Sequence, residues 1–392
     1  MKRPAEELSC LVPGTFELPA TASGSLSGKT FVAKDLLAVA GHASSFGNAR
    51  WRETHTASEA TSPIITKLLA EGADLVGMAK LDQLAGSLVG NIGEGTAPLN
   101  SLYPDRFTGG SSSGSASAVA GELVDFAIGT DTAGSVRVPA AACGLYGLRP
   151  TYHSIKNEGV LPWAASFDVV GILSKDLGLV RDVYKVLRSE ASELTTITQI
   201  LLPIDCLELV SVETAAAVTK TAQDLAEKHG IELKEVNFAH FMGDSARNLF
   251  SRIAGRENWQ AHGEWIKANH QYLAPDLYNR MEIAQQVSAG PEEKVSADSQ
   301  ERENYTKAVS KIITSHSVLI APIMYDLSPL RTANPDELQN YRKNTLILNV
   351  VSGLAGLPEI VMPVVGVNNL TYGVGVIGSK NADLTMLDFL SS

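Results

Sequence analysis

Predicted helices and short apolar runs alternate along most of this chain, and the alternation restricts its fold more than any other feature of the sequence. The predicted strands are residues 29–34, 74–80, 126–129, a stretch after 229, 318–323 and 359–364. The predicted helices are residues 62–71, 115–123, 212–229, 300–315 and 336–354. Helices that alternate with short strands are typical of an α/β fold with a mainly parallel or mixed sheet.

The chain contains no repeat, low-complexity linker or proline-rich stretch that would mark a domain boundary. Residues 1–392 are therefore predicted to form one domain. Hydrophobic residues make up 44% of the sequence and charged residues 19%, which is enough apolar material for a large buried core.

The charge balance argues against a nucleic-acid partner. The chain has 32 Lys and Arg against 43 Asp and Glu, a formal net charge of −11, and no basic block. Nonspecific affinity for nucleic acid comes mainly from Lys and Arg that displace counterions from the phosphate backbone. We therefore expect no nucleic-acid partner.

Other sequence features predict a cytoplasmic protein without a membrane partner. The longest apolar stretch, residues 346–367, is interrupted by polar residues and prolines and should not span a bilayer. No apolar segment follows the basic residues at the amino terminus, so a secretory signal is not expected. Cys10, Cys143 and Cys206 are widely spaced and odd in number, which fits a reducing compartment rather than a disulfide framework or a zinc site.

Two familiar glycine motifs do not carry function here. Gly373-x-Gly375-x-x-Gly378 matches the dinucleotide fingerprint, but 14 residues after it are too few for the remaining βαβ unit, so a glycine-rich strand is expected. The stretch from Gly110 to Gly114 matches the G-x-S-x-G nucleophile elbow, but the residues before it make a poor strand.

Two Gly/Ser turns, residues 109–114 and 131–135, are the most unusual local feature. Such turns allow close backbone approach and can direct several N–H groups at one point, as an anion or oxyanion site requires. A flexible linker is disfavoured because apolar residues flank both turns. A phosphate cradle is disfavoured because no Gly-Lys-Ser/Thr follows either turn.

The segment from Gly109 to Pro150 resembles the signature sequence of the amidase signature family over all of its 42 residues. The resemblance implies a central mixed β-sheet covered by helices on both faces, a signature core at about 29–150 and a variable, substrate-determining region at about 185–345. It also implies that Ser135 is the acyl nucleophile, that Ser111 is a bridging serine held at a cis peptide bond, and that Lys34 is the base. The block that contains Lys34, FVAKDLLAVAGHASSFGN, is similar to the family's apolar strand ending in Lys-Asp.

The implied Ser-Ser-Lys triad is chemically sound. A serine hydroxyl is a weak nucleophile until a base takes its proton. Lysine is a base only when neutral, so its pKa must fall from about 10.4 toward roughly 7 or 8, and burial supplies such a shift. Ser111 can pass the proton between Lys34 and Ser135 and later to the leaving amine.

Further roles follow from the same resemblance. The backbone N–H groups of the turn would form the oxyanion hole, namely those of Thr132, Ala133, Gly134 and Ser135. Asp131, Arg137 and Ser112 would support the loop. The turn has alanine at 133, where the family often has glycine. If this position needs a positive φ, alanine costs about 1 kcal/mol and alters the oxyanion geometry slightly.

Other candidates are less suitable. Lys80 is a competing base that we reject, because its block resembles a strand and loop that line the cavity. The eight histidines are scattered and form no metal-ligand pattern, so no metal and no organic cofactor are implied.

The sequence thus predicts an amidohydrolase that cleaves a small carboxamide to a carboxylate and ammonia. Residues 257–266 and Arg280 look like a segment of the shorter amidases, which include plant indole-3-acetamide hydrolases, so an arylacetamide is the preferred substrate. Trp259, His262 and Trp265 can equally pack a helix face. Allophanate- or malonamate-type amides, a noncatalytic subunit and a tRNA-dependent amidotransferase subunit are the alternatives. The partner expected is a small amide, and a homodimer is left open.

Overall fold

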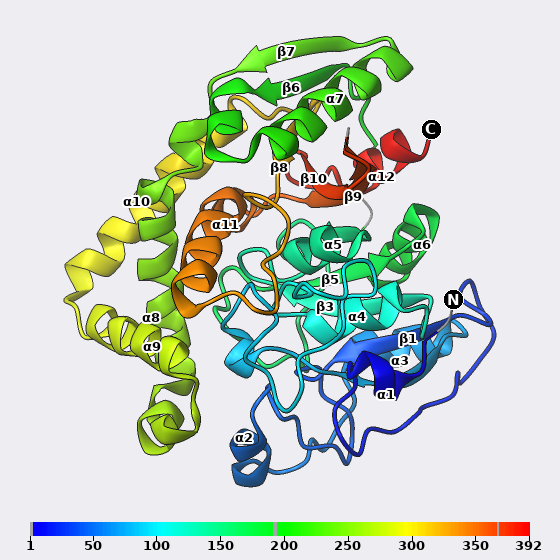
Figure 1. Cartoon of the computed structure of the whole chain (residues 1–392), viewed down its shortest axis with the longest axis vertical. Helices are drawn as coiled ribbons and strands as arrows, with labels where there is room; N and C mark the ends of the chain where they lie inside the picture. The colour runs from blue at the N-terminus through cyan, green and yellow to red at the C-terminus, as the bar shows by residue number, and fades with distance from the viewer. Residues whose placement is uncertain (1–2, 191–193, 367) are drawn as a thin grey trace.

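A ten-stranded mixed sheet runs through the computed structural model and includes strands from both halves of the chain (Figure 1). The structure describes residues 3–190, 194–366 and 368–392. The strand order is β2-β1-β3-β5-β4-β9-β10-β8-β6-β7. The strands are β1 Thr30–Lys34, β2 Asp74–Ala79, β3 Phe126–Asp131, β4 Tyr146–Arg149, β5 Val169–Ser174, β6 Gln199–Pro203, β7 Glu232–Val236, β8 Ser317–Pro322, β9 Glu359–Val365 and β10 Thr371–Ile377.

The pairing confirms the predicted α/β class with a mixed sheet. Strand β1 pairs in parallel with β2 and β3, and β6 pairs in parallel with β7 and β8. The ladders between these groups are antiparallel. Strands β4, β5 and β6 were absent from the sequence prediction. The glycine motif at 373–378 lies along β10, between β8 and β9, as expected of a glycine-rich strand.

Helices cover both faces of the sheet, as the resemblance implies. They are α1 Ala5–Leu8, α2 Ala49–Thr54, α3 Pro63–Ala70, α4 Ser113–Ala120, α5 Arg137–Cys143, α6 Leu177–Leu187, α7 Val212–His229, α8 Asp244–Asn269, α9 Pro275–Ser288, α10 Glu292–Ser310, α11 Pro335–Ala355 and α12 Asp383–Ser391. Short 3₁₀ turns are η1 Gln83–Ala85, η2 Ile204–Leu209, η3 Ala239–Phe241 and η4 His270–Tyr272. Helix α10 begins eight residues before its predicted start at 300 and ends five residues before its predicted end at 315.

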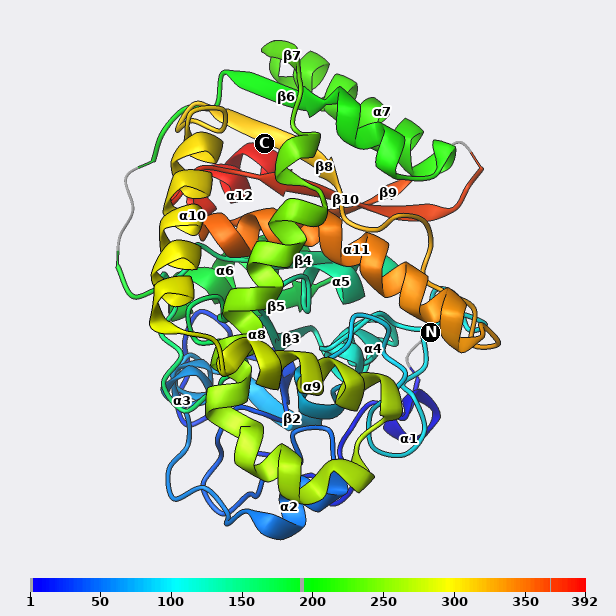
Figure 2. The same ribbon diagram turned by 90° about the vertical axis from the view of Figure 1, so that its left-hand side faces the viewer.

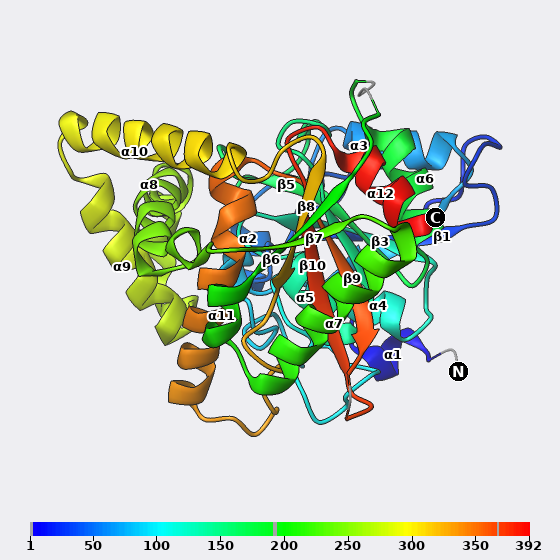
Figure 3. The same cartoon turned by 90° about the horizontal axis from the view of Figure 1, so that it is seen from above.

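Different sets of helices cover the two faces of the sheet. Helices α3, α6, α7 and α12 pack on one face, and α4, α5 and α11 pack on the other. Helices α8, α9 and α10 lie outside α11, on one side of the molecule (Figures 2 and 3). The space between α8, α9 and α11 and the loops around α4 and α5 holds the cavity described below.

Strand periodicity determines where Lys34 lies. Successive side chains of a strand point to opposite faces. Phe31 and Ala33 belong to the core on the α3 face, whereas Val32 belongs to the core on the α4 face. Lys34 has the same parity as Val32, so its side chain leaves β1 toward α4 and the loop before it.

Candidate active site

Lys34 and Ser111 meet in the interior. The Nζ atom of Lys34 donates hydrogen bonds to Ser111 Oγ at 2.8 Å and to Thr130 Oγ1 at 3.0 Å. Both Lys34 and Ser111 are fully buried. Strands β1 and β3 are parallel, so their carboxyl ends, which carry Lys34 and Thr130, lie at the same edge of the sheet.

The loop that carries Ser111 is packed tightly. The Gly110–Ser111 peptide bond is cis, as the resemblance implies. A Cβ atom at Gly110 would overlap Asp82 Oδ2 and lie 2.9 Å from the backbone nitrogen of Gly90, so glycine is required for this approach. The next residue, Ser112, donates its N–H to the carbonyl oxygen of Ser135 at 3.1 Å. This bond places the Ser111 loop beside the turn that carries Ser135.

The environment of Lys34 favours its neutral form. Burial lowers the pKa of Lys34 to about 7, while nearby Asp82, Asp131 and Asp168 act in the opposite direction. A lysine with this pKa is neutral in a large fraction of molecules near pH 7, and a neutral lysine can accept a proton.

Asp82 and Thr130 are members of this site that the sequence analysis missed. Asp82 is buried, and its Oδ2 accepts the N–H of Gly90 at 3.0 Å. Its Oδ1 has no hydrogen-bond partner in the described part of the chain. Burial raises the pKa of Asp82 to about 6. Asp82 lies outside the signature segment and Thr130 lies inside it, but in both cases only the fold brings the residue to Lys34.

Asp131 organises the turn that carries Ser135. Its carboxylate accepts the backbone N–H groups of Gly134 at 2.8 Å, Val136 at 3.1 Å and Arg137 at 3.2 Å. It also accepts hydrogen bonds from the guanidinium groups of Arg137, at 2.8 and 3.0 Å, and of Arg149, at 3.0 Å. Burial alone raises the pKa of Asp131, but the two arginines hold it well below its usual range.

The charge network continues beyond the signature segment. Arg137 Nη1 donates to Glu359 Oε2 at 2.5 Å and to the carbonyl oxygen of Asn349 at 3.1 Å. Arg149 Nη2 donates to the carbonyl oxygen of Phe167 at 3.0 Å. The predicted contact between Asp131 and Arg137 is thus present. Arg149 lies in the same segment but was given no role, and Glu359 was missed because it lies 222 residues from Arg137.

The turn itself corrects one expectation. The positive φ lies at Gly134, at 118°, and not at Ala133, so the cost predicted for alanine does not arise. The Gly134 N–H is already bound to Asp131, whereas the N–H groups of Thr132, Ala133 and Ser135 have no acceptor among the described residues. Ser112 Oγ donates to the carbonyl oxygen of Thr130 at 3.3 Å and accepts its N–H at 3.4 Å, at the end of β3 that leads into the turn.

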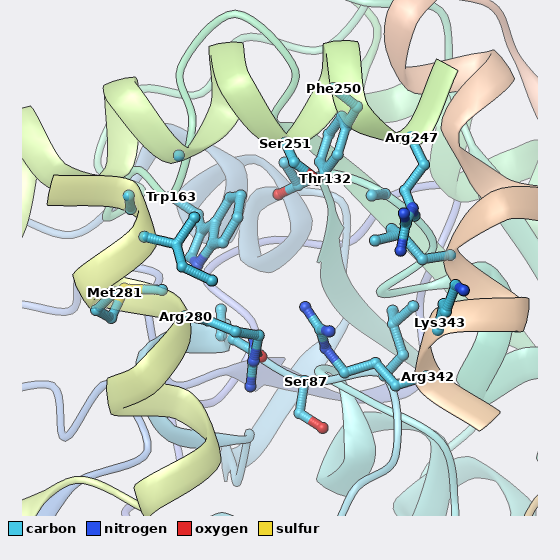
Figure 4. A pocket seen from close by; sticks show the side chains of 18 of the residues that line it. Ser87, Thr132, Trp163, Arg247, Phe250, Ser251, Arg280, Met281, Arg342 and Lys343 are labelled. Carbon is cyan, nitrogen blue, oxygen red and sulfur yellow. Dashed lines mark hydrogen bonds between the residues drawn. The ribbon is translucent and has the colours of Figure 1, made fainter. Parts of the chain in front are cut away.

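A cavity of about 340 Å³ opens beside this turn (Figure 4). Ser135, Thr132 and Ala133 line it, whereas Lys34 and Ser111 lie behind its wall. The opposite wall comes from α8, α9 and α11 and includes Phe250, Arg280 and Arg342. Ser135 is therefore in reach of a small molecule, and the buried Lys34–Ser111 pair is shielded from one.

The remaining candidates lie elsewhere. Lys80 Nζ donates to Ser9 Oγ and to the carbonyl oxygen of Thr96, both at 3.3 Å, away from Lys34. His262 and Trp265 of α8 pack against Trp51, which fits the packing interpretation. Across residues 3–190, 194–366 and 368–392, no group of three or more His, Cys, Asp or Glu could hold a metal ion.

The chain is similar over most of its length to known proteins. The model of the family described as Amidase matches residues 15–387. Amidase 1 of Oryza sativa subsp. japonica is 31% identical over 93% of this chain and 89% of that protein. Translocon at the outer membrane of chloroplasts 64 of Pisum sativum is 28% identical over 97% of this chain and 68% of that protein.

A solved structure titled "Crystal structure of amidase" superposes with a TM-score of 0.82 and 25% identity, over 94% of this chain and 85% of that one. In the described residues, no helix is long and apolar enough to cross a membrane.

Proposed function

From the premise that this chain belongs to the amidase family and is a hydrolase of amide C–N bonds, we propose that it cleaves a small carboxamide to a carboxylate and ammonia through an acyl-enzyme on Ser135. The observation that carries the proposal is the buried 2.8 Å hydrogen bond between Lys34 and Ser111, beside the turn that presents Ser135 to the cavity.

In the first half-reaction, Ser135 Oγ attacks the amide carbonyl carbon and loses its proton through Ser111 to neutral Lys34. The tetrahedral intermediate carries a negative oxygen, for which the unpaired N–H groups of Thr132, Ala133 and Ser135 are the proposed donors. The C–N bond then breaks, and the proton returns through Ser111 to the leaving nitrogen, which departs as ammonia.

In the second half-reaction, water attacks the acyl-enzyme ester. Lys34 again takes a proton through Ser111, and the tetrahedral intermediate expels Ser135 Oγ, which is reprotonated. The products are the carboxylate and the free enzyme. Asp131 takes no proton in this scheme, because its ion pairs with Arg137 and Arg149 keep it ionised, and its role is to hold the turn.

The side chains that line the cavity bear on the acyl group of the substrate. The aromatic rings of Trp163 and Phe250 in the cavity wall suit an arylacetamide such as indole-3-acetamide. Malonamate- and allophanate-type amides are the charged alternatives. We also propose that the protein is cytoplasmic, which fractionation of cells would test.

The alternative to an enzyme is a noncatalytic subunit of an assembly. The pea relative is named as part of a translocon, and this name is the observation in favour of such a role. The hydrogen bond between Lys34 and Ser111, together with the bond from Ser112 N–H to the Ser135 carbonyl oxygen, favours the enzyme.

Ammonia release from a panel of amides tests the proposal. The panel contains indole-3-acetamide, phenylacetamide, malonamate and allophanate, with wild type compared with Ser135→Ala. Ser115→Ala is the matched control, because Ser115 is a buried serine of α4 that bonds to the Ile128 carbonyl outside the relay. Release that is abolished in Ser135→Ala alone supports the proposal. Ammonia release that persists in Ser135→Ala contradicts the proposal. A folded wild-type protein without activity on any amide of the panel favours the noncatalytic role.

A further inference from the structure

The helical wall of the cavity is positively charged in an acidic protein. The chain has a net charge of −11, yet the charged groups that line the cavity are Arg247, Arg280, Arg342, Lys343 and a single acid, Asp276. Figure 4 shows the side chains of Arg280 and Arg342 reaching from α9 and α11 into the same region of the cavity. Repulsion among these cations disfavours the arrangement unless an anion joins them.

The guanidinium of Arg342 has no ion-pair partner among the described residues. Arg342 is half-buried in α11, and its side chain makes no ion pair or hydrogen bond with any residue that the structure describes. Burial and the neighbouring Arg280 and Arg247 together lower the pKa of Arg342 to about 9, whereas Asp276 opposes the shift. A guanidinium in this setting lacks a counter-ion.

Arg280 and Arg247 are only partly matched. Arg280 Nη2 pairs with Asp276 at 3.0 Å, and its Nη1 donates to the carbonyl oxygen of Gly86. Its Nε is buried without a partner among the described residues, and so is Nε of Arg247. Arg247 Nη2 pairs with Asp244 at 3.0 Å, so Arg280 and Arg247 each have one carboxylate, and Arg342 is the guanidinium of the described lining that has none.

We infer that the amide substrate of this site carries a carboxylate, which Arg342 and Arg280 bind while the amide lies at Ser135. The inference rests on the proposed function. A guanidinium presents parallel N–H donors that match a carboxylate in a bidentate contact. The apolar side chains of Trp163, Phe250 and Met281 would contact the carbon chain or ring between the two polar ends. An uncharged arylacetamide would leave the cations of the wall unmatched, so the substrate class is a monoamide of a dicarboxylic acid.

Pairs of amides that match in shape and differ in charge test the inference. Succinamate is compared with 4-methylpentanamide, glutaramate with 5-methylhexanamide, and 4-carboxyphenylacetamide with 4-isopropylphenylacetamide. We expect wild-type kcat/KM to favour the carboxylate of at least one pair by tenfold or more. In Arg342→Gln, this preference should fall about ten- to a hundredfold. Arg188→Gln, which removes a half-buried arginine at the end of α6 outside the cavity, should keep it.

A binding measurement separates failure of the inference from failure of the proposed function. Succinamate and 4-methylpentanamide are titrated into Ser135→Ala, with and without Arg342→Gln. Amide turnover without a preference for charge would overturn the inference and leave the function intact. Absence of all turnover would overturn the function. The carboxylate site would then still be supported by tighter binding of succinamate that Arg342→Gln weakens tenfold, and overturned by equal binding of the two amides.

Discussion

Asp131 and Arg342 both place a charge close to the same cavity, but they differ in how that charge is matched. Asp131 lies in the signature segment and accepts hydrogen bonds from Arg137, Arg149 and three backbone N–H groups. Arg342 lies in the region from 185 to 345 and has no partner among the described residues. The buried charge beside Ser135 is therefore paired without a ligand, whereas the charge of Arg342 in the helical wall would be paired by one.

The two walls of the cavity are suited to two different functions, catalysis and substrate recognition. Catalysis needs groups held in a fixed geometry, which a fully bonded network provides. Recognition of a charged substrate needs a charge that stays available until the substrate arrives. Substitutions in the first wall should therefore affect every substrate or the fold itself, and substitutions in the second should affect substrate choice.

Replacement of the proposed base gives the largest expected effect. Lys34→Met removes the amine and keeps an unbranched chain in a buried site, so kcat/KM should fall about 10⁴-fold for charged and neutral amides alike. Lys80→Met is the matched control and should retain activity. A loss of activity confined to charged or to neutral amides would contradict the assignment of catalysis to the wall around Ser135.

Breaking the core ion network should lower stability strongly. Asp131→Asn leaves Arg137 and Arg149 buried with too little negative charge, so the free energy of unfolding should fall by about 3 to 5 kcal/mol. Urea denaturation measures this change. Asp224→Asn, which removes an exposed carboxylate paired with Lys220, should cause a much smaller one. Equal effects would show that the network adds nothing specific.

Removal of the carboxylate beside Lys34 should shift the pH profile. The base acts when neutral, so kcat/KM of wild type should rise with pH through about 7 and level above it. Asp82 raises the pKa of Lys34, so Asp82→Asn should move the rising limb to lower pH. Rates between pH 5 and 9 test this, with exposed Glu158→Gln as the control. A shift to higher pH would contradict the placement of Asp82.

Substitution in the helical wall should have the smallest effect on the fold. Arg342→Gln removes a cation that contacts no acid and lies near two others, so the free energy of unfolding should change by no more than about 0.5 kcal/mol. Thermal denaturation beside Asp131→Asn checks this. A large destabilisation by Arg342→Gln would show that the charge has a structural partner after all.

The sequence predicted the parts of the site that are continuous in the chain. Residues 109–150 form one segment in which the turn, Ser111, Ser135 and their nearest support lie close in sequence. Thr130 lies in the same segment, but its contact with Lys34 depends on the pairing of β1 with β3. Asp82 and Glu359 lie outside the segment and were not predicted, because only the fold brings them to the site. Arg280 was noted for its resemblance, but the convergence of Arg247, Arg280 and Arg342 required three helices to be placed.

The fold shows the same limit. Strands separated by helices were predicted, whereas β4 and β5, which pair directly in antiparallel fashion, were not. Helices α8 and α9 were also missed. Helix α8 contacts α9, α10 and α11, so its apolar residues are spread around the helix instead of forming one stripe. The first turns of α10 are polar and mostly exposed, which hid its true start at Glu292.

Covalent labelling tests most directly whether Lys34 activates Ser135. A fluorophosphonate that reacts with activated serines is incubated with wild type and Lys34→Met, and the adduct is located by mass spectrometry. We predict one adduct, on Ser135, whose rate of formation rises with pH through about 7 and is lost in Lys34→Met. Labelling of another serine, or equal labelling of Ser135 in Lys34→Met, would contradict the proposed relay.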